Sequence, residues 1–255
     1  DRKKKENTFR SMIWYFLPLY GPLVMALFVL KQPDMGTAGM ILLFPLLLYV
    51  LAGLPLFEIL LGVGGAIVTF AILVIAEPYR MDRVVVLWDP FSYAANRGYQ
   101  TVQSLIAVGS GGLFGQSVGE GMSKFLYLPE QYTDFAYAVF SQEFGFIGSV
   151  FVLLLYLVFL LAGFSAARKL KETYAALLVY GLTMLISVQG IVNIAMVIGC
   201  FPVTGIPLPF ISYGGSSLLM NIISVALIYG TTVQSLRETD LEERKRRIAQ
   251  MEGRG

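Results

Sequence analysis

Two carboxylates and a lysine form a compact polar block between two long apolar parts of the chain. The block reads Lys124-Phe125-Leu126-Tyr127-Leu128-Pro129-Glu130-Gln131-Tyr132-Thr133-Asp134-Phe135. Pro129 can open a helix at its first position, and Glu130 and Asp134 are then four residues apart, so we expect both carboxylates to face the same way. Because the block stands at the threshold of an apolar segment, it is the first candidate for a catalytic site.

The residue types that the chain lacks narrow this chemistry. The sequence has no histidine and one cysteine, Cys200. His-based triads, His-ligated metals and an internal disulfide framework are therefore excluded. General acid or base catalysis falls to Asp, Glu, Lys or Tyr, and we predict no metal-ligating residues. The net charge of +2 gives no argument for binding nucleic acid.

The composition is that of an all-α integral membrane protein. Hydrophobic residues make up 56% of the chain, charged residues make up 14%, and the mean hydropathy is +0.69. Runs of roughly twenty apolar residues, enough to cross about 30 Å of hydrocarbon, predict a polytopic bundle with six spans. The runs lie near residues 13–30, 37–53, 57–76, 136–162, 176–199 and 216–236. The Gly- and Ser-rich stretch 99–114 predicts a half-inserted or buried helix.

Basic residues set the predicted orientation of these spans. Of the 19 Lys and Arg residues, 14 flank three of the runs: Arg2, Lys3, Lys4, Lys5, Arg10, Arg168, Lys169, Lys171, Arg237, Arg244, Lys245, Arg246, Arg247 and Arg254. Six spans place both termini and the loop 164–174 on one face, which the positive-inside rule makes cytoplasmic. Segment 77–134 is then a large extracytoplasmic loop, and residues 237–255 form a cytoplasmic tail. A span at 99–114 would invert the last three spans and break this pattern.

Two further segments are irregular. The glycines at 109–115 fit neither dinucleotide nor phosphate-loop spacing, and at membrane depth they favour either tight backbone packing or a bend that lines a cavity for a lipid substrate. Three prolines within residues 202–209 forbid regular helix and predict a stiff outward loop. That loop is equally suited to be a rigid connector or a wall of the outer cavity, with Ser212 and Ser216 facing an anionic head group.

Five ordered motifs resemble the SEDS family, the bacterial shape, elongation, division and sporulation proteins. The motifs are Lys31-Gln32-Pro33-Asp34-Met35-Gly36-Thr37-Ala38, Gly98-Tyr99-Gln100 with Gln103-Ser104, Gly109-Ser110-Gly111-Gly112, Leu128-Pro129-Glu130 with Thr133-Asp134-Phe135, and Pro202 through Ser217. Glu77-Pro78-Tyr79-Arg80 and Gly98-Tyr99-Gln100 look more like the division and sporulation branch than the rod-elongation branch.

The resemblance implies a membrane glycosyltransferase that polymerises lipid II, an undecaprenyl-linked disaccharide-pentapeptide, into peptidoglycan strands at the outer face of the bacterial plasma membrane. Family members have ten spans, so residues 1–255 would be one membrane domain that matches the last six, and the start at Asp1 predicts a missing upstream portion. The family's catalytic aspartate falls on Asp134, which the charge-derived topology also places outside. Implied partners are a class B penicillin-binding protein and other divisome or sporulation proteins.

The implied reaction joins an α-linked pyrophosphate donor into a β-linked product, so one displacement with inversion suffices. Asp134 would deprotonate the acceptor 4-hydroxyl, but a free aspartate, with a pKa of about 3.9, is a weak base that needs burial or a neighbouring carboxylate. Lys124, Arg80 and Arg83 would stabilise the leaving pyrophosphate, or else serve only as snorkelling interfacial charges; a divalent cation (Mg²⁺ or Mn²⁺) is the alternative. The candidate substrate-binding residues are Lys124, Glu130, Arg80, Arg83, Gln103, Ser212 and Ser216.

The chain departs from the family pattern in two places. It reads Ser141-Gln142-Glu143-Phe144-Gly145, with one acid where relatives commonly have two, and it has Ser123 where glutamine is usual. Glu143, expected about two and a half turns beyond Asp134 along the fourth span, is either functional or a buried partner of a polar neighbour. Gln189, Asn193 and Asn221 are equally suited to a functional role or to interhelical hydrogen bonds, and the predicted catalytic set omits them.

Two other functions fit parts of the sequence. A lipid II flippase would use broken helices, Gly-rich segments and intramembrane polar residues. It would place its essential polar residues near the midplane, however, whereas the strongest cluster here lies in an outer loop. A non-catalytic scaffold for a partner's span would not require Asp134. The polymerase ranks first and the scaffold last.

Overall fold

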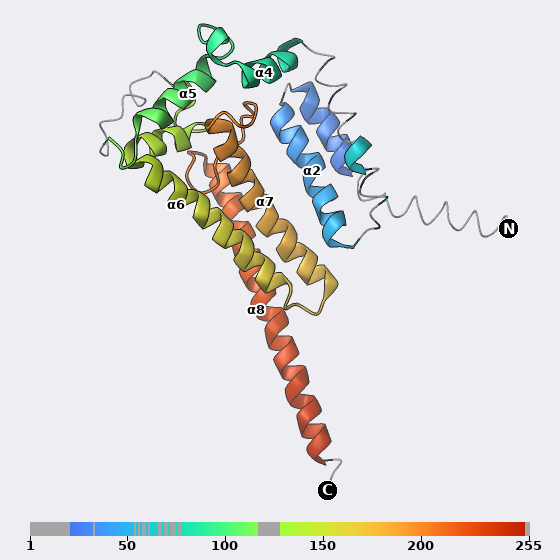
Figure 1. The fold of residues 1–255 in the computed structure, drawn as a ribbon. Coiled ribbons are helices and arrows are strands. Elements are labelled where there is room, and N and C mark those ends of the chain that lie inside the picture. The colour runs from blue at the N-terminus through green and yellow to red at the C-terminus, as the bar shows by residue number, and fades with distance from the viewer. Residues whose placement is uncertain are drawn as a thin grey trace, which may run out of the picture. The chain divides into compact units, whose positions relative to one another are not determined.

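The computed structural model describes residues 21–116, apart from residue 33 and scattered positions between 54 and 77, and residues 128–252. Contacts divide the chain into two compact units, Asp1–Val85 with Val203–Ile206, and Val86–Pro202 with Pro207–Gly255. Every regular element in the described ranges is helical (Figure 1). The prediction that residues 1–255 form one membrane domain stays a prediction.

The first unit contains α2 (Met35–Leu51) and the larger part of α4 (Pro78–Trp88). Asp34 caps α2 by accepting a 3.0 Å hydrogen bond from the backbone N–H of Thr37. The predicted span 37–53 therefore coincides with a real helix, although its 17 residues reach only about 26 Å. An apolar helix at Gly21–Lys31 covers the described part of the predicted span 13–30.

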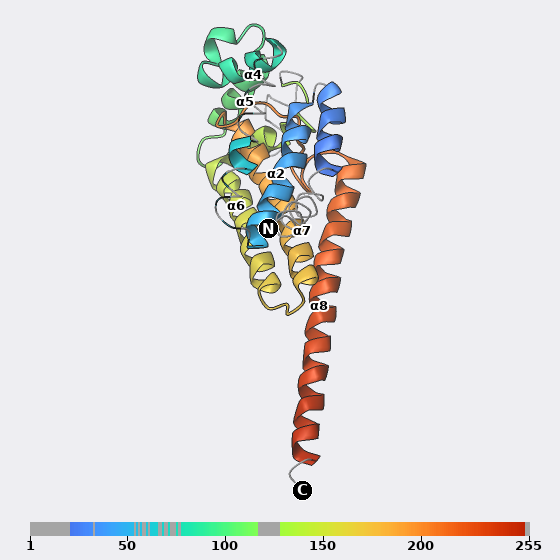
Figure 2. The ribbon, with the colours of Figure 1, turned by 90° about the vertical axis from the view of Figure 1, so that its right-hand side faces the viewer.

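Three helices in the second unit are long and apolar enough to cross a membrane. They are α6 (Ala136–Ala167), α7 (Thr173–Val197) and the stretch Gly215–Leu241 of α8 (Gly215–Glu252). These helices match the predicted spans 136–162, 176–199 and 216–236. Within this unit α7 contacts both α6 and α8, and α8 continues past the ends of the other two (Figures 1 and 2). The predicted all-α membrane class is confirmed.

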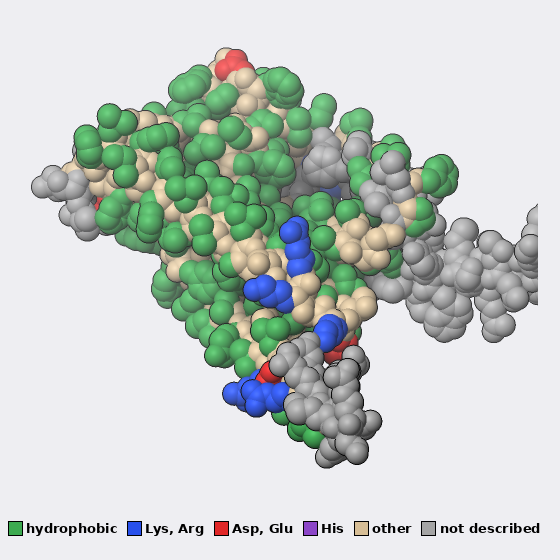
Figure 3. Space-filling view, turned by 60° about the horizontal axis from the view of Figure 1, so that its bottom comes forward, with side chains coloured by type: hydrophobic (Ala, Val, Ile, Leu, Met, Phe, Trp, Pro, Cys, Tyr) green, Lys and Arg blue, Asp and Glu red, His purple; other side chains and the backbone are tan. Residues whose placement is uncertain are grey.

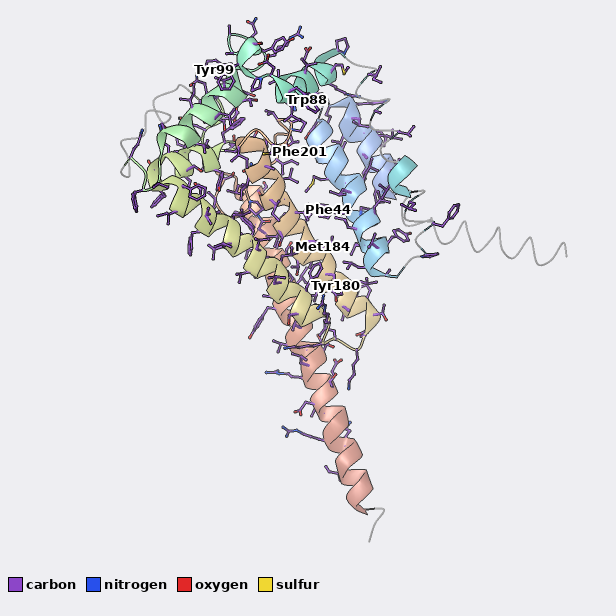
Figure 4. The ribbon with its side chains drawn as sticks, viewed as in Figure 1. Phe44, Trp88, Tyr99, Tyr180, Met184 and Phe201 are labelled. Carbon is purple, nitrogen blue, oxygen red and sulfur yellow. The ribbon has the colours of Figure 1, made fainter. Side chains whose placement is uncertain are left out.

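Small residues let α6 and α7 approach closely. A Cβ on Gly163 of α6 would collide with the Thr183 side chain of α7, and a Cβ on Gly190 of α7 would meet the ring of Tyr156. Tyr180, which lies one turn before Met184 on α7 (Figure 4), packs edge-to-face on Phe164 with ring centroids 4.9 Å apart. These contacts hold the pair of spans that supports the outer loops.

The helices in the described part of segment 77–134 are α4, the 3₁₀ helix η1 (Phe91–Tyr93) and α5 (Tyr99–Ser110). Asp89, two residues before η1, accepts hydrogen bonds from the hydroxyl and backbone N–H of Ser92, and these bonds lower the pKa of Asp89. With 12 residues α5 is about 18 Å long, too short to cross about 30 Å of hydrocarbon. One face of α5 is buried, and on it Ser104 donates to the carbonyl of Val197. Whether α5 is half-inserted or buried, as the sequence left open, stays a prediction.

The helix α6 is broken at Gly145, where φ is +67° and ψ is −165°. The predicted span 136–162 is therefore interrupted near its start, at a position that the apolar run did not indicate. The stretch after the break, residues 146–167, is still about 33 Å long and can cross the hydrocarbon by itself. Glu143, which is buried, belongs to the short helical segment before the break.

The glycine-rich turn after α5 satisfies the backbone groups that this break exposes. The backbone N–H groups of Phe146 and Ile147 donate to the carbonyls of Gly112 and Leu113, and Gln116 donates to the carbonyl of Gln142. A Cβ on Gly115 would collide with the carbonyl of Glu143. Tight backbone packing, one of the two roles predicted for these glycines, is thus what the structure contains.

Basic side chains gather at one end of the second unit. Viewed from the C-terminal end of α8, the space-filling picture has Lys and Arg side chains grouped there, while apolar side chains cover the flanks (Figure 3). Arg168 and Lys169 after α6 and Lys171 before α7 are exposed, as are Arg244 and Lys245 of α8. This distribution is the one that the predicted cytoplasmic face requires.

Candidate functional site

The loop before α6 is a series of turns and not a helix. Residues 128–135 have no helical assignment, and α6 begins at Ala136. Glu130 adopts a left-handed conformation with φ +53°, and its carbonyl accepts hydrogen bonds from the N–H groups of Thr133 and Phe135 at 3.2 and 3.1 Å. The prediction that Pro129 opens a helix is therefore wrong, since a left-handed residue next to it stops helical propagation. Glu130 and Asp134 are not paired by helical spacing.

Buried anchors hold the ends of this loop. Leu128 is 2% exposed and Phe135 is 1% exposed, so each end is fixed in the protein interior. Between them Glu130 is exposed, and its carboxylate accepts a 2.7 Å hydrogen bond from the hydroxyl of Thr133. The side chain of Asp134 is half-buried. A half-buried carboxylate on an anchored loop can meet a substrate while part of its surroundings is protein.

Three consecutive carbonyls around Asp134 are held from outside the loop. The carbonyl of Tyr132 accepts from the backbone N–H of Tyr213 at 2.7 Å, that of Thr133 from the hydroxyl of Ser212, and that of Asp134 from the side-chain amide of Asn193 at 2.8 Å. We call this set of three bonds the carbonyl clamp. It fixes the backbone of the residue that carries the proposed catalytic carboxylate.

The proline-containing segment that supplies part of the clamp is itself fastened to the spans. The carbonyl of Pro207 accepts from the Gln189 amide of α7 at 3.0 Å, and the carbonyl of Pro209 accepts from the Tyr156 hydroxyl of α6 at 2.6 Å. The predicted irregular loop is confirmed, because no helix occurs in its described residues 201–214. It contacts the loop of Asp134 directly through Ser212 and Tyr213.

The candidate serines and Gln103 occupy different settings. The Ser212 hydroxyl accepts a 2.7 Å hydrogen bond from the Leu208 N–H and gives its own proton to the Thr133 carbonyl, so its hydrogen bonds hold loop to loop. Ser216 is exposed in the first turn of α8, and Gln103 is half-buried on α5. Their contact with a substrate stays a prediction.

The candidate cations lie in other parts of the chain. Arg80 is buried on α4 and donates to the carbonyl of Leu30 at 3.2 Å, and Arg83 donates to the carbonyl of Val203 at 2.6 Å. Both are in the first unit, whereas Asp134 is in the second, so a shared site for them stays a prediction. Lys124 lies outside the described residues.

Sequence reasoning did not place Asn193 at the site. It considered interhelical hydrogen bonds for Gln189 and Asn193, whereas both amides donate to backbone carbonyls of loops. The available signal was their spacing, because two amides four residues apart on an apolar helix share one face. The spacing does not say, however, whether the amides bond to a neighbouring helix or to a loop.

The described residues contain no group of three or more His, Cys, Asp or Glu side chains that could hold a metal ion. The predicted divalent cation stays a prediction. What the described geometry does supply is a carboxylate with a fixed backbone, which can accept a proton from a group placed within hydrogen-bond reach.

Comparison with known proteins gives consistent matches. A family model for FtsW, RodA and SpoVE, described as "Cell cycle protein", matches residues 2–236. Stage V sporulation protein E of Bacillus subtilis (strain 168) is 38% identical over 233 residues, which are 89% of this chain and 62% of the relative. The probable peptidoglycan glycosyltransferase FtsW of Coxiella burnetii is 41% identical over 208 residues, 78% of this chain and 55% of the relative. The chain thus spans about three-fifths of the length of these relatives.

Two solved structures share the fold. A chain of a peptidoglycan synthase complex, in work on the structural coordination of polymerization and crosslinking, matches with a TM-score of 0.70 and 26% identity over 87% of this chain and 62% of that one. A mutant of the rod shape determining protein RodA of Thermus thermophilus matches with a TM-score of 0.58 and 26% identity, over 88% of this chain and 58% of that one.

Proposed function

The chain belongs to the FtsW/RodA/SpoVE family, and on that premise we propose that the protein it represents polymerises lipid II into peptidoglycan glycan strands. Relatives that are 36–41% identical carry the name peptidoglycan glycosyltransferase FtsW, which supports a glycosyltransferase. Since the chain covers only part of those relatives, its activity, substrate and partners are proposals about the whole protein. The observation that carries the proposal is the clamped backbone of Asp134.

Asp134 is the proposed general base. Its carboxylate accepts the proton of the acceptor sugar's 4-hydroxyl while that oxygen forms a bond to the anomeric carbon of the donor. The bond from this carbon to the pyrophosphate breaks at the same time, and the pyrophosphate leaves with the electron pair. Attack opposite the leaving group turns an α-linked donor into a β-linked product. A positioned base of this kind contributes about 10²–10⁴-fold to the rate.

The leaving pyrophosphate needs positive charge near it. We assign this role to Lys124, Arg80 and Arg83, with a divalent cation bound by the pyrophosphate as the alternative. Arg80 and Arg83 each donate a hydrogen bond to a backbone carbonyl. A guanidinium matches the geometry of a phosphate, so their residue type supports this assignment.

The proposed setting is the outer face of the bacterial plasma membrane, with both termini of the chain in the cytoplasm. The basic side chains near the C-terminal end of α8 and between α6 and α7 support this orientation. We further propose a class B penicillin-binding protein as the partner that crosslinks the strands. The similarity to a chain of a peptidoglycan synthase complex that couples polymerization and crosslinking supports this partner.

A lipid II flippase is the alternative, and the break in α6 favours it. Transporters often bind substrates at interrupted spans. In this chain, however, Phe146, Ile147 and the carbonyl of Gln142 at the break are bonded to the glycine-rich turn. Because these groups are occupied by the protein itself, the break supports a rigid packing role better than a transport path.

The test uses the full-length protein reconstituted with its partner and supplied with labelled lipid II. Wild type should form glycan chains, whereas Asp134→Asn and Asp134→Ala should form none while they still fold and bind the partner. Polymer from either variant would rule out Asp134 as the base. Absence of polymer from a well-folded wild type, together with lipid II movement across the vesicle membrane, would support the flippase.

A further inference from the structure

We propose that Asn193 is a positioning residue for the Asp134 carboxylate and that Ser212 supports it on the neighbouring peptide. The inference rests on the proposed function, since it assumes that Asp134 is the base. It concerns two residues that do not need to touch the substrate. They would act through the carbonyl clamp, which holds the loop 128–135 that carries Asp134; we call this loop the catalytic loop.

The clamp acts on the backbone where the carboxylate is attached. A peptide group is planar, so fixing its carbonyl oxygen also fixes the orientation of the atoms on both sides. The clamp holds the peptide before Asp134 through the Thr133 carbonyl and the peptide after it through the Asp134 carbonyl. With both flanking peptides held, the direction of the Asp134 Cα–Cβ bond is determined. The carboxylate can then vary only through its own two side-chain torsions.

The donor on α7 is rigid. Asn193 is 0% exposed and lies among buried α7 residues, with Ile194 and Met196 at 4% and 0% exposure. An amide in a dry interior makes a stronger hydrogen bond than one in water, and it has few other conformations. The bond from Asn193 joins the outer loop to the helix that packs on both α6 and α8. The catalytic loop therefore takes its position from the most embedded described span.

The second donor is oriented by its own partner. Because the Ser212 oxygen accepts the N–H of Leu208, the hydroxyl proton is directed to the Thr133 carbonyl. The segment that carries Ser212 is in turn tied to Tyr156 and Gln189 of the spans. Both donors thus belong to fastened parts of the structure. This is the arrangement expected where a catalytic group must be held within about 0.5 Å of its productive position.

A displaced general base lowers the rate of the catalysed reaction. A misplacement of about 1 Å can reduce a catalysed rate by about 10²-fold, even when the substituted residue is far from the reacting atoms. Loss of the Asn193 bond should therefore lower kcat and leave the KM for lipid II nearly unchanged. Loss of the Ser212 bond, which holds the peptide before Asp134, should also lower kcat, but by a smaller factor because Ser212 lies in a loop.

The experiment compares Asn193→Leu and Ser212→Ala with wild type in the full-length protein, reconstituted with its partner and given labelled lipid II. Thr183→Val is the matched control, since Thr183 is equally buried on α7 and the substitution keeps its shape. Rates are expressed per folded, partner-bound molecule. Asn193→Leu is also made in an Asp134→Glu background, where the carboxylate is already displaced.

We expect Asn193→Leu to lower kcat by about 10-fold or more with KM within about twofold, Ser212→Ala to lower it severalfold, and Thr183→Val to stay near wild type. In the Asp134→Glu background, the factor by which Asn193→Leu lowers kcat should be at least threefold smaller than in the wild-type background. A general loosening of the fold would lower kcat by the same factor in both backgrounds. If Asp134→Glu is too slow to measure, the test rests on the wild-type background, where a positioning role predicts that Asn193→Leu lowers kcat and leaves KM nearly unchanged.

Two results would overturn the positioning role. One is an Asn193→Leu enzyme with kcat within about twofold of wild type; the other is an equal loss in both Asp134 backgrounds. If Asn193→Leu fails to fold, Ser212→Ala carries the test, because Ser212 lies in a loop. The Asp134→Asn variant separates the two hypotheses: polymer from it overturns the proposed base, whereas an inactive Asp134→Asn beside a normal Asn193→Leu overturns only the positioning role.

Discussion

The side-chain amide of Asn193 donates a 2.8 Å hydrogen bond to the carbonyl oxygen of Asp134, 59 residues earlier in the chain. The bond joins the interior of α7 to the loop with the proposed catalytic carboxylate. It is one of several contacts in which polar groups of the spans hold the outer loops.

Gly145→Ala should strongly destabilise the protein. Gly145 has φ +67°, and a Cβ there would lie 2.6 Å from the carbonyl oxygen of Leu113. The left-handed backbone alone costs about 1–3 kcal/mol for a residue with a side chain, and the collision adds to it. The control is Gly109→Ala on α5, where a Cβ meets nothing within 4 Å. Thermal unfolding in detergent should separate the two variants, and equal midpoints would contradict the packing argument.

Tyr156→Phe should loosen the proline segment. The substitution removes the hydroxyl that donates to the carbonyl of Pro209 at 2.6 Å and leaves that carbonyl without this donor. A loss of about 1–3 kcal/mol of stability is expected. Tyr229→Phe is the control, because Tyr229 is 71% exposed. Denaturation of the two purified variants measures the difference, and a loss in Tyr156→Phe no larger than in the control would mean that the hydroxyl contributes little.

Arg83 and Lys124 should respond differently to truncation. Arg83→Ala removes a 2.6 Å hydrogen bond to the carbonyl of Val203 and should lower both stability and polymerisation. Lys124→Ala should lower polymerisation by about 10-fold or more with little change in the unfolding temperature, if Lys124 meets the pyrophosphate. Arg83→Lys and Lys124→Arg serve as charge-preserving controls. Full polymerisation by Lys124→Ala would remove Lys124 from the proposed site.

Removal of divalent cations tests the remaining source of positive charge. If Mg²⁺ or Mn²⁺ neutralises the pyrophosphate, EDTA should slow polymerisation, and the added metal should restore the rate, without a change in the unfolding temperature. The unfolding temperature distinguishes a metal that acts on the substrate from a metal that stabilises the protein. The described residues contain no group of three or more His, Cys, Asp or Glu side chains that could hold a structural metal, so we expect the unfolding temperature to stay the same. An undiminished rate in EDTA would mean that Lys and Arg side chains, and not a metal ion, stabilise the leaving pyrophosphate.

Cys200 reports the orientation of the membrane domain. It is exposed in the segment between α7 and α8, which the predicted topology places outside the cell. A membrane-impermeant thiol reagent should therefore label Cys200 in intact spheroplasts, in a variant whose other cysteines, wherever they lie in the full-length protein, are replaced by serine. Cys200→Ser is the control. Labelling only after permeabilisation would invert the proposed topology.

Local properties of the sequence were sufficient for the membrane class, three of the spans and the family. Hydropathy is a sum over neighbouring residues, so α6, α7 and the apolar part of α8 could be located without knowing what they contact. The helix at α5 could be expected to be too short to span, since Gly and Ser interrupt its apolar run. The motif that carries Asp134 was likewise visible as an ordered string of residues.

Tertiary structure alone decided how the site is held. A turn at Glu130 replaced the predicted helix start, and its carbonyl accepts from Thr133 and Phe135 close by in the chain. The predicted span is interrupted at Gly145, where the backbone is bonded to the glycine-rich turn more than 30 residues earlier. The link from Asn193 to Asp134 could not be predicted from sequence, since an amide on an apolar helix can bond to a neighbouring helix or to a loop. Which partner it finds depends on long-range packing, and hydropathy and spacing contain no information about that.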